Sequence, residues 1–83
     1  METRVAIISI IVENAEDPAI DELNGLLHAY AQYVIGRMGI PYRAKNINVI
    51  SVAVDAPTDQ INALAGKLGR LPGITAKAVY SAR

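Results

Sequence analysis

One segment of the sequence combines residue types that are suited to binding a small anion. It reads Gly36-Arg37-Met38-Gly39-Ile40-Pro41-Tyr42-Arg43. Glycines let the backbone approach a ligand closely, and a guanidinium group binds a carboxylate or phosphate through paired hydrogen bonds. The alternative interpretation is structural: a β-bulge and turn whose arginines are solvated or paired with carboxylates. The candidate ligand-binding residues in this segment are Arg37, Gly39, Pro41, Tyr42 and Arg43.

The only histidine marks a second place where chemistry is conceivable. His28 follows Asn24 by four residues, near the margin of the apolar face of a predicted helix, and we include both as candidate ligand-binding residues. Transition-metal sites draw on several His, Cys or carboxylate ligands, and this chain has one histidine and no cysteine. We therefore predict no metal and no cofactor. Two alternatives remain for His28. A second His28 from a symmetry-related copy could complete a metal site, or His28 could be a structural histidine at the edge of the helix face or hydrogen-bonded to a neighbouring strand.

A group of carboxylates lies between residues 13 and 22. No glycine-bearing loop of the kind found in calcium-binding helix-loop-helix sites accompanies it. Acidic residues at the start of a helix interact favourably with its dipole, which accounts for most of the group without a bound cation. The group comprises Glu13, Glu16, Asp17, Asp21 and Glu22.

The sequence lacks the common enzyme signatures. It contains no nucleophile elbow, no phosphate-binding P-loop, no dinucleotide fingerprint and no HExxH motif. With one histidine and no cysteine, catalysis would rest on carboxylates, tyrosines or lysines. We predict a non-enzymatic protein with no catalytic residues.

Composition narrows the class of partner. The chain has 83 residues, 52% of them hydrophobic, and its eight Lys and Arg balance eight Asp and Glu. No charge excess favours nucleic acid or a membrane surface, and we predict neither as a partner. The longest apolar run, Val5 to Val12, is eight residues broken by Ser9, far short of the roughly 20 residues that span a bilayer. The absence of cysteine and of a basic-then-apolar N-terminus predicts a cytoplasmic protein.

Hydrophobic periodicity predicts four strands and two helices. The strands are expected at 5–12, 33–42, 47–54 and 74–81, the second of them bent or bulged because of its glycines and proline. One helix begins with Asp17 as N-cap and ends near residue 31 or 32, and the other is capped by Asp55 or Thr58 and ends before Pro72. The helical stripes repeat after 41 residues: Ile20, Leu23, Leu27 and Tyr30 correspond to Ile61, Leu64, Leu68 and Leu71.

This order predicts a single α+β domain over residues 1–83. Two βαβ halves interleave as the ferredoxin-like βαββαβ fold, a four-stranded antiparallel sheet with two helices on one face. Both faces of the first and third strands are apolar, yet the helices cover only one, so we predict a homo-oligomer, a dimer or tetramer, formed on the other face. The candidate interface residues are Val5, Ile7, Ser9, Ile11, Ile47, Val49 and Ser51.

Three blocks, taken in order, resemble a known family. They are Asn24-Gly25-Leu26-Leu27-His28, the segment from Gly36 to Arg43, and Gly66-Lys67-Leu68-Gly69-Arg70-Leu71-Pro72-Gly73. Together they resemble the iron-only hydrogenase system regulators, a family whose ferredoxin-like fold is similar to ACT domains and to the C-terminal domain of nickel-responsive repressors. The repressors use several histidines and a cysteine at their metal site, which this chain lacks.

The resemblance implies a stand-alone ACT-like regulatory module. Domains of this kind bind small ligands or metals at subunit interfaces, and the resemblance implies that the module regulates the iron-only hydrogenase system. Together with the segment from Arg37 to Arg43, this predicts that a small anionic ligand or a partner protein binds through that segment at a subunit interface. ACT domains bind ligands near the turn after the first strand, here residues 13–17, which is acidic and lacks their glycine. The alternatives are a purely structural or protein-interaction oligomer, and a small oligomeric enzyme with a pocket lined by Tyr30, Tyr33 or His28.

Overall fold

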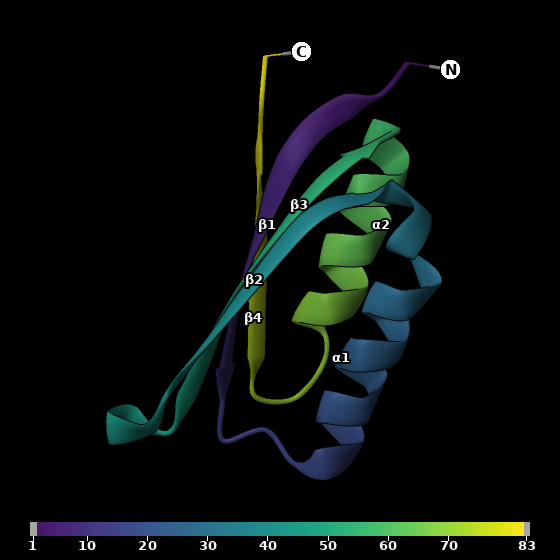
Figure 1. The fold of residues 1–83 in the computed structure, drawn as a ribbon. Coiled ribbons are helices and arrows are strands. Elements are labelled where there is room, and N and C mark those ends of the chain that lie inside the picture. The colour runs from purple at the N-terminus through teal and green to yellow at the C-terminus, as the bar shows by residue number, and fades with distance from the viewer. Residues whose placement is uncertain (1, 83) are drawn as a thin grey trace.

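The structure is a computed structural model and describes residues 2–82. The strands are β1 (Arg4–Glu13), β2 (Val34–Tyr42), β3 (Ile47–Ala56) and β4 (Ile74–Tyr80). The helices are α1 (Asp17–Ala29) and α2 (Thr58–Gly69), and single 3-10 turns, η1 (Ala31–Tyr33) and η2 (Arg43–Lys45), lie at the two ends of β2. The order βαββαβ confirms the predicted fold class (Figure 1).

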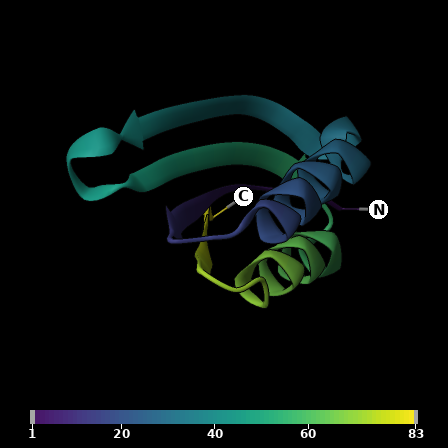
Figure 2. The ribbon, with the colours of Figure 1, turned by 90° about the horizontal axis from the view of Figure 1, so that it is seen from below.

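The four strands form one antiparallel sheet in the order β2-β3-β1-β4, with both helices on the same face (Figure 2). β4 is an edge strand, as predicted. β2 is the other edge, and its register with β3 shifts between Val34 and Gly36, which confirms the predicted irregularity. The β2–β3 hairpin extends past the helices, and its tip leans away from them (Figure 1). No helix among residues 2–82 is long and apolar enough to cross a membrane.

The core fills the space between the helices and one face of the sheet. Every second residue of β1 is buried there, because successive strand residues point to opposite faces. The repeated stripe places equivalent leucines of the two helices in this core. The buried core residues are Ala6, Ile8, Ile10, Val12, Ala19, Leu23, Leu27, Val52, Val54, Ala56, Ile61, Leu64, Leu68, Leu71 and Ile74.

The helix starts differ from the predicted ones. The N-cap of α1 is Glu16, not Asp17, and that of α2 is Pro57, not Asp55 or Thr58. Neither start has a side-chain hydrogen bond that caps it. Pro18 lies in the first turn of α1, where its missing N–H is not needed.

A close contact joins the two connections at one end of the sheet. Gly73 has a φ of +77°, and a Cβ built on it would lie 2.5 Å from the carbonyl oxygen of Glu13. The Glu13 N–H donates a hydrogen bond of 2.7 Å to the Gly73 carbonyl. Only glycine combines this backbone conformation with this approach. The α2–β4 connection is thereby fixed against the end of β1.

Candidate functional site

The candidate residues of β2 alternate between the two faces of the sheet. Arg37, Gly39 and Pro41 pair with Val52, Ile50 and Asn48 of β3 and share their face, on which the helices lie. Tyr42 pairs with Ile47 and belongs to the opposite face, and Arg43 follows in η2. The sequence segment is continuous, but the strand divides it into two places.

A groove between α1 and β2 brings five of the seven candidate ligand residues together. Two adjoining hollows of about 300 and 340 Å³ share Asn24 and Arg37. His28 lines one hollow, and Gly39 and Pro41 line the other. We call this the α1–β2 groove. Its remaining lining residues are Val12, Ile20, Leu23, Leu27, Ala31, Val34, Ile40, Asn48, Ile50 and Val52.

The α1–β2 groove combines one cationic side chain with an apolar wall. Arg37 is the one Lys or Arg among the described lining residues, and none of them is a carboxylate. Within residues 2–82 the Arg37 guanidinium has no hydrogen bond or ion pair, so its five donors are available. Asn24 adds an amide, and Leu23 and Val52 are buried apolar walls. A carboxylate with a short hydrocarbon tail matches this arrangement.

The hairpin tip holds the two remaining candidates. Tyr42 and Arg43 line a small hollow of about 50 Å³ with Pro41, Asn46 and Ile47. Both are exposed. Asn46 adopts the left-handed conformation, φ 54°, which closes the turn. The tip is therefore a projecting surface, distinct from the α1–β2 groove.

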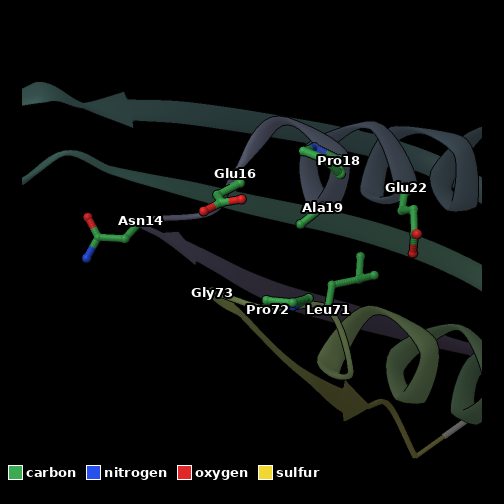
Figure 3. Close-up of a pocket in the computed structure, with 8 residues that line it drawn as sticks. All are labelled: Asn14, Glu16, Pro18, Ala19, Glu22, Leu71, Pro72 and Gly73. Carbon is green, nitrogen blue, oxygen red and sulfur yellow. The ribbon is translucent and has the colours of Figure 1, made fainter.

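A third hollow, of about 320 Å³, lies between the β1–α1 turn and the α2–β4 connection. Figure 3 shows Glu16 and Glu22 at its rim and Leu71 projecting from the opposite side. No Lys, Arg or His is among its described lining residues, so this hollow offers no positive charge to bind an anion. This hollow adjoins residues 13–17, the turn that corresponds to the ligand-binding turn of ACT domains. The α2–β4 connection also lines this hollow, and no pattern in the sequence predicted that it would lie beside the β1–α1 turn.

The predicted interface residues all lie on the sheet face away from the helices. Val5, Ile7 and Val49 are exposed, while Ile11 and Ile47 are half-buried. Sequence reasoning missed four further large apolar side chains there, although alternation along β2 could have revealed three of them. These are Met38, Ile40 and Tyr42 of β2 and Val79 of β4, each at least half exposed.

We name this surface the open face and order it by strand register. In its middle row, Met38, Ser51, Ser9 and Lys77 lie side by side across the four strands. The rows on either side are apolar apart from Thr75. Their members are Gly36, Ala53, Ile7 and Val79 on one side, and Ile40, Val49, Ile11 and Thr75 on the other.

Comparisons with known proteins identify the family. Residues 4–78 match the family described as "TM1266-like: Iron-only hydrogenase system regulator, putative". The structure is similar to that of the uncharacterized protein TM1266 from Thermotoga maritima, with a TM-score of 0.90 and 35% identity over 95% of this chain and 98% of that one. No curated protein sequence matches.

A second solved structure supports the fold. It is the ACT domain of the GTP pyrophosphokinase of Chlorobium tepidum, with a TM-score of 0.75 and 16% identity over 93% of this chain and 99% of that one. At this identity the similarity concerns the fold alone, and it confirms the ACT-like architecture. The family match covers nearly the whole chain, and so does the similarity to the Thermotoga maritima protein. The chain therefore belongs to the TM1266-like family.

Proposed function

We propose that this chain is a stand-alone ACT-like regulatory module of the iron-only hydrogenase system that senses a small anionic ligand in the α1–β2 groove. The observation that supports the ligand class is the unpaired Arg37 guanidinium beside Asn24, within a groove whose other lining residues are apolar except for His28 and Asn48. A guanidinium fork binds a carboxylate bidentately, and the apolar wall takes a short aliphatic tail. The ligand is thus a small amphipathic carboxylate.

We further propose that the module works as a homo-oligomer through the open face. Eight large apolar side chains of the described chain are exposed, and seven belong to this face: Val5, Ile7, Met38, Ile40, Tyr42, Val49 and Val79. Exposed apolar side chains gathered on one face in this way are typical of a contact with another protein. Because β2 alternates its side chains between the α1–β2 groove and the open face, ligand binding and subunit contact share one strand.

Isothermal titration with a matched pair of probes tests the ligand class. The probes are 3-methylbutanoate and its uncharged amide, which differ in the carboxylate. We expect the wild type to bind the acid more tightly than the amide, Arg37→Ala to lose this preference, and Arg37→Lys to retain part of it as a point charge. Equal binding of acid and amide, or an unchanged preference in Arg37→Ala, would contradict an anion site at Arg37.

A protein-interaction role without a ligand is the second candidate, and the size of the open face favours it. It predicts no binding of either probe by wild type or variant. An enzymatic role has less support, because His28 faces no carboxylate among the described lining residues of the α1–β2 groove, and Tyr30 and Tyr33 do not line it. General acid–base catalysis needs a positioned partner for the proton. We therefore propose a non-enzymatic module.

A further inference from the structure

We infer that the open face binds a second copy of this chain about a two-fold axis parallel to the strands, with the β2–β3 hairpin tip of each copy against the β1–α1 turn of the other. This inference rests on the proposed homo-oligomer and adds its geometry. The basic tip is defined as Arg43 and Lys45, and the acidic turn as Glu13, Glu16 and Asp17.

The size of the open face suits a second copy. Four strands about 4.8 Å apart, with same-face residues every 6.6 Å or so, give five rows and a patch on the order of 20 by 25 Å. Because its side chains protrude and the hairpin tip extends it, the accessible area of this patch is larger than its flat area. It approaches the roughly 800 Å² per partner that specific interfaces bury. Two sheets stacked in this way keep their strands within about 30° of each other. A face-to-face sandwich of two copies follows.

A face-to-face dimer can have its two-fold axis along the strands or across them, and the position of Lys77 favours the axis along the strands. Lys77 lies in the central row on β4, at one edge, and Met38 lies in the same row at the other edge. An axis across the strands would place each β4 over its symmetry mate and bring two Lys77 ammonium groups together. An axis along the strands places β4 over β2, so Lys77 meets Met38 and its ammonium reaches water at the edge. Like charges facing each other disfavour the first arrangement.

The charges at the hairpin end select the same axis. Glu13 pairs with Ile47 in the last row of the sheet, so the acidic turn and the basic tip lie at the same end of the molecule on different strands. An axis along the strands places β2 and β3 of one copy over β4 and β1 of the other, and hence the basic tip over Glu13 and the turn after it. The tip leans toward the open side, where the partner would lie (Figure 1). The crosswise axis would instead bring the tip near Asp55 at the opposite end.

None of the charged side chains in the basic tip or the acidic turn has a hydrogen bond or ion pair among residues 2–82, and all five are exposed. Their charges can therefore be reversed without breaking a contact within one copy. Two-fold symmetry makes each tip-to-turn contact occur twice. A copy with a reversed tip would pair favourably with a copy that has a reversed turn, at both contacts.

The test uses two charge-reversal variants and one matched control. The tip variant is Arg43→Glu with Lys45→Glu, the turn variant is Glu13→Lys with Glu16→Lys, and the control is Asp21→Lys, at an exposed position of α1 outside the open face. Dimer dissociation constants are measured by sedimentation equilibrium, and mixtures by native mass spectrometry with one partner isotope-labelled. Circular dichroism verifies that each variant is folded.

We expect the tip and turn variants each to raise the dissociation constant by about tenfold or more. A one-to-one mixture should form the heterodimer in preference to either homodimer, and the dissociation constant of Asp21→Lys should lie within about twofold of that of the wild type. The inference is overturned if either variant dimerises like the wild type, if the mixture forms no heterodimer, or if Asp21→Lys weakens the dimer as much as the turn variant does.

A wild type that stays monomeric at every concentration overturns this inference and the proposed oligomer together. If the wild type dimerises and both charge-reversal variants dimerise as tightly, the proposed geometry is overturned but the homo-oligomer is not. In both cases the 3-methylbutanoate titration of the wild type and Arg37→Ala tests the ligand proposal independently. Failure of the two-fold arrangement is thus distinguishable from failure of the ligand proposal.

Discussion

Arg37 pairs with Val52 across the β2–β3 ladder, and Val52 is fully buried beneath the helices. The guanidinium therefore leaves the sheet on the side of α1. The next residue, Met38, pairs with Ser51 and leaves it on the open face. One step along a strand separates the proposed ligand residue from a proposed subunit contact, because strand side chains alternate with a period of two.

Substitutions at Arg37 and Met38 should affect ligand binding and dimerisation separately. We expect Arg37→Ala to weaken binding of 3-methylbutanoate while leaving the dimer dissociation constant unchanged. Met38→Lys should do the opposite, since it introduces a charge into the apolar open face. Titration calorimetry and sedimentation equilibrium on both variants measure the two effects. Loss of both activities in either variant would argue that the two faces are not independent.

A second adjacent pair tests which face forms the core of one copy. Ile8 is fully buried, whereas Ile7 is 45% exposed on the open face. Ile8→Ala should lower the free energy of unfolding by about 2–5 kcal/mol at any protein concentration, since it leaves a cavity. Ile7→Ala should lower the apparent stability only at concentrations where the wild type is dimeric. Urea unfolding at several protein concentrations distinguishes the two.

Gly73 is expected to be the glycine least tolerant of substitution. Gly73→Ala forces a Cβ against the Glu13 carbonyl at a φ of +77°, and should lower the free energy of unfolding by about 1–3 kcal/mol. Gly25→Ala is the matched control, because Gly25 lies within α1 and a Cβ there meets nothing within 4 Å. It should raise the free energy of unfolding by about 0.5–1 kcal/mol. Thermal unfolding compares them, and a neutral Gly73→Ala would contradict the close approach.

An exposed contact links the two helices near their C-terminal ends. The Lys67 ammonium donates a hydrogen bond of 2.9 Å to the Tyr30 hydroxyl and lies 5.2 Å from the centre of its ring. Tyr30→Phe removes the hydrogen bond and keeps the ring, so the loss should be under about 1 kcal/mol. Lys67→Ala should cost more, since it also removes the cation–π contact. Tyr33→Phe is the control in the same denaturation assay.

The sequence predicted much of the candidate site's composition but not its division. Arg37, Gly39 and Pro41 were grouped with Tyr42 and Arg43 because the residues are contiguous. The β2 register then directs the first three toward α1, where they meet Asn24 and His28. Contiguity along the chain carries no information on which side of a sheet a residue faces until the bulge and the pairing with β3 are known.

Local patterns were sufficient for the secondary structure, because β-branched runs and 3.6-residue stripes reflect burial on one or both sides. They were insufficient for the helix starts at Glu16 and Pro57, where no side chain forms a cap. The predicted caps Asp17, Asp55 and Thr58 have the right chemistry for capping, but the helices begin at neighbouring positions, within the one or two residues over which helix ends vary or close to it.

The sequence by itself determined the ferredoxin-like order of elements and the presence of a second apolar face, since both follow from the periodicity of side chains along each element. Only the tertiary structure decided what lies together across elements. It joined Asn24 of α1 to Arg37 of β2, aligned Met38 and Lys77 at opposite edges of one row, and set the basic tip and the acidic turn at one end of the molecule. These relationships depend on strand order and register, which arise from packing between segments distant in the chain.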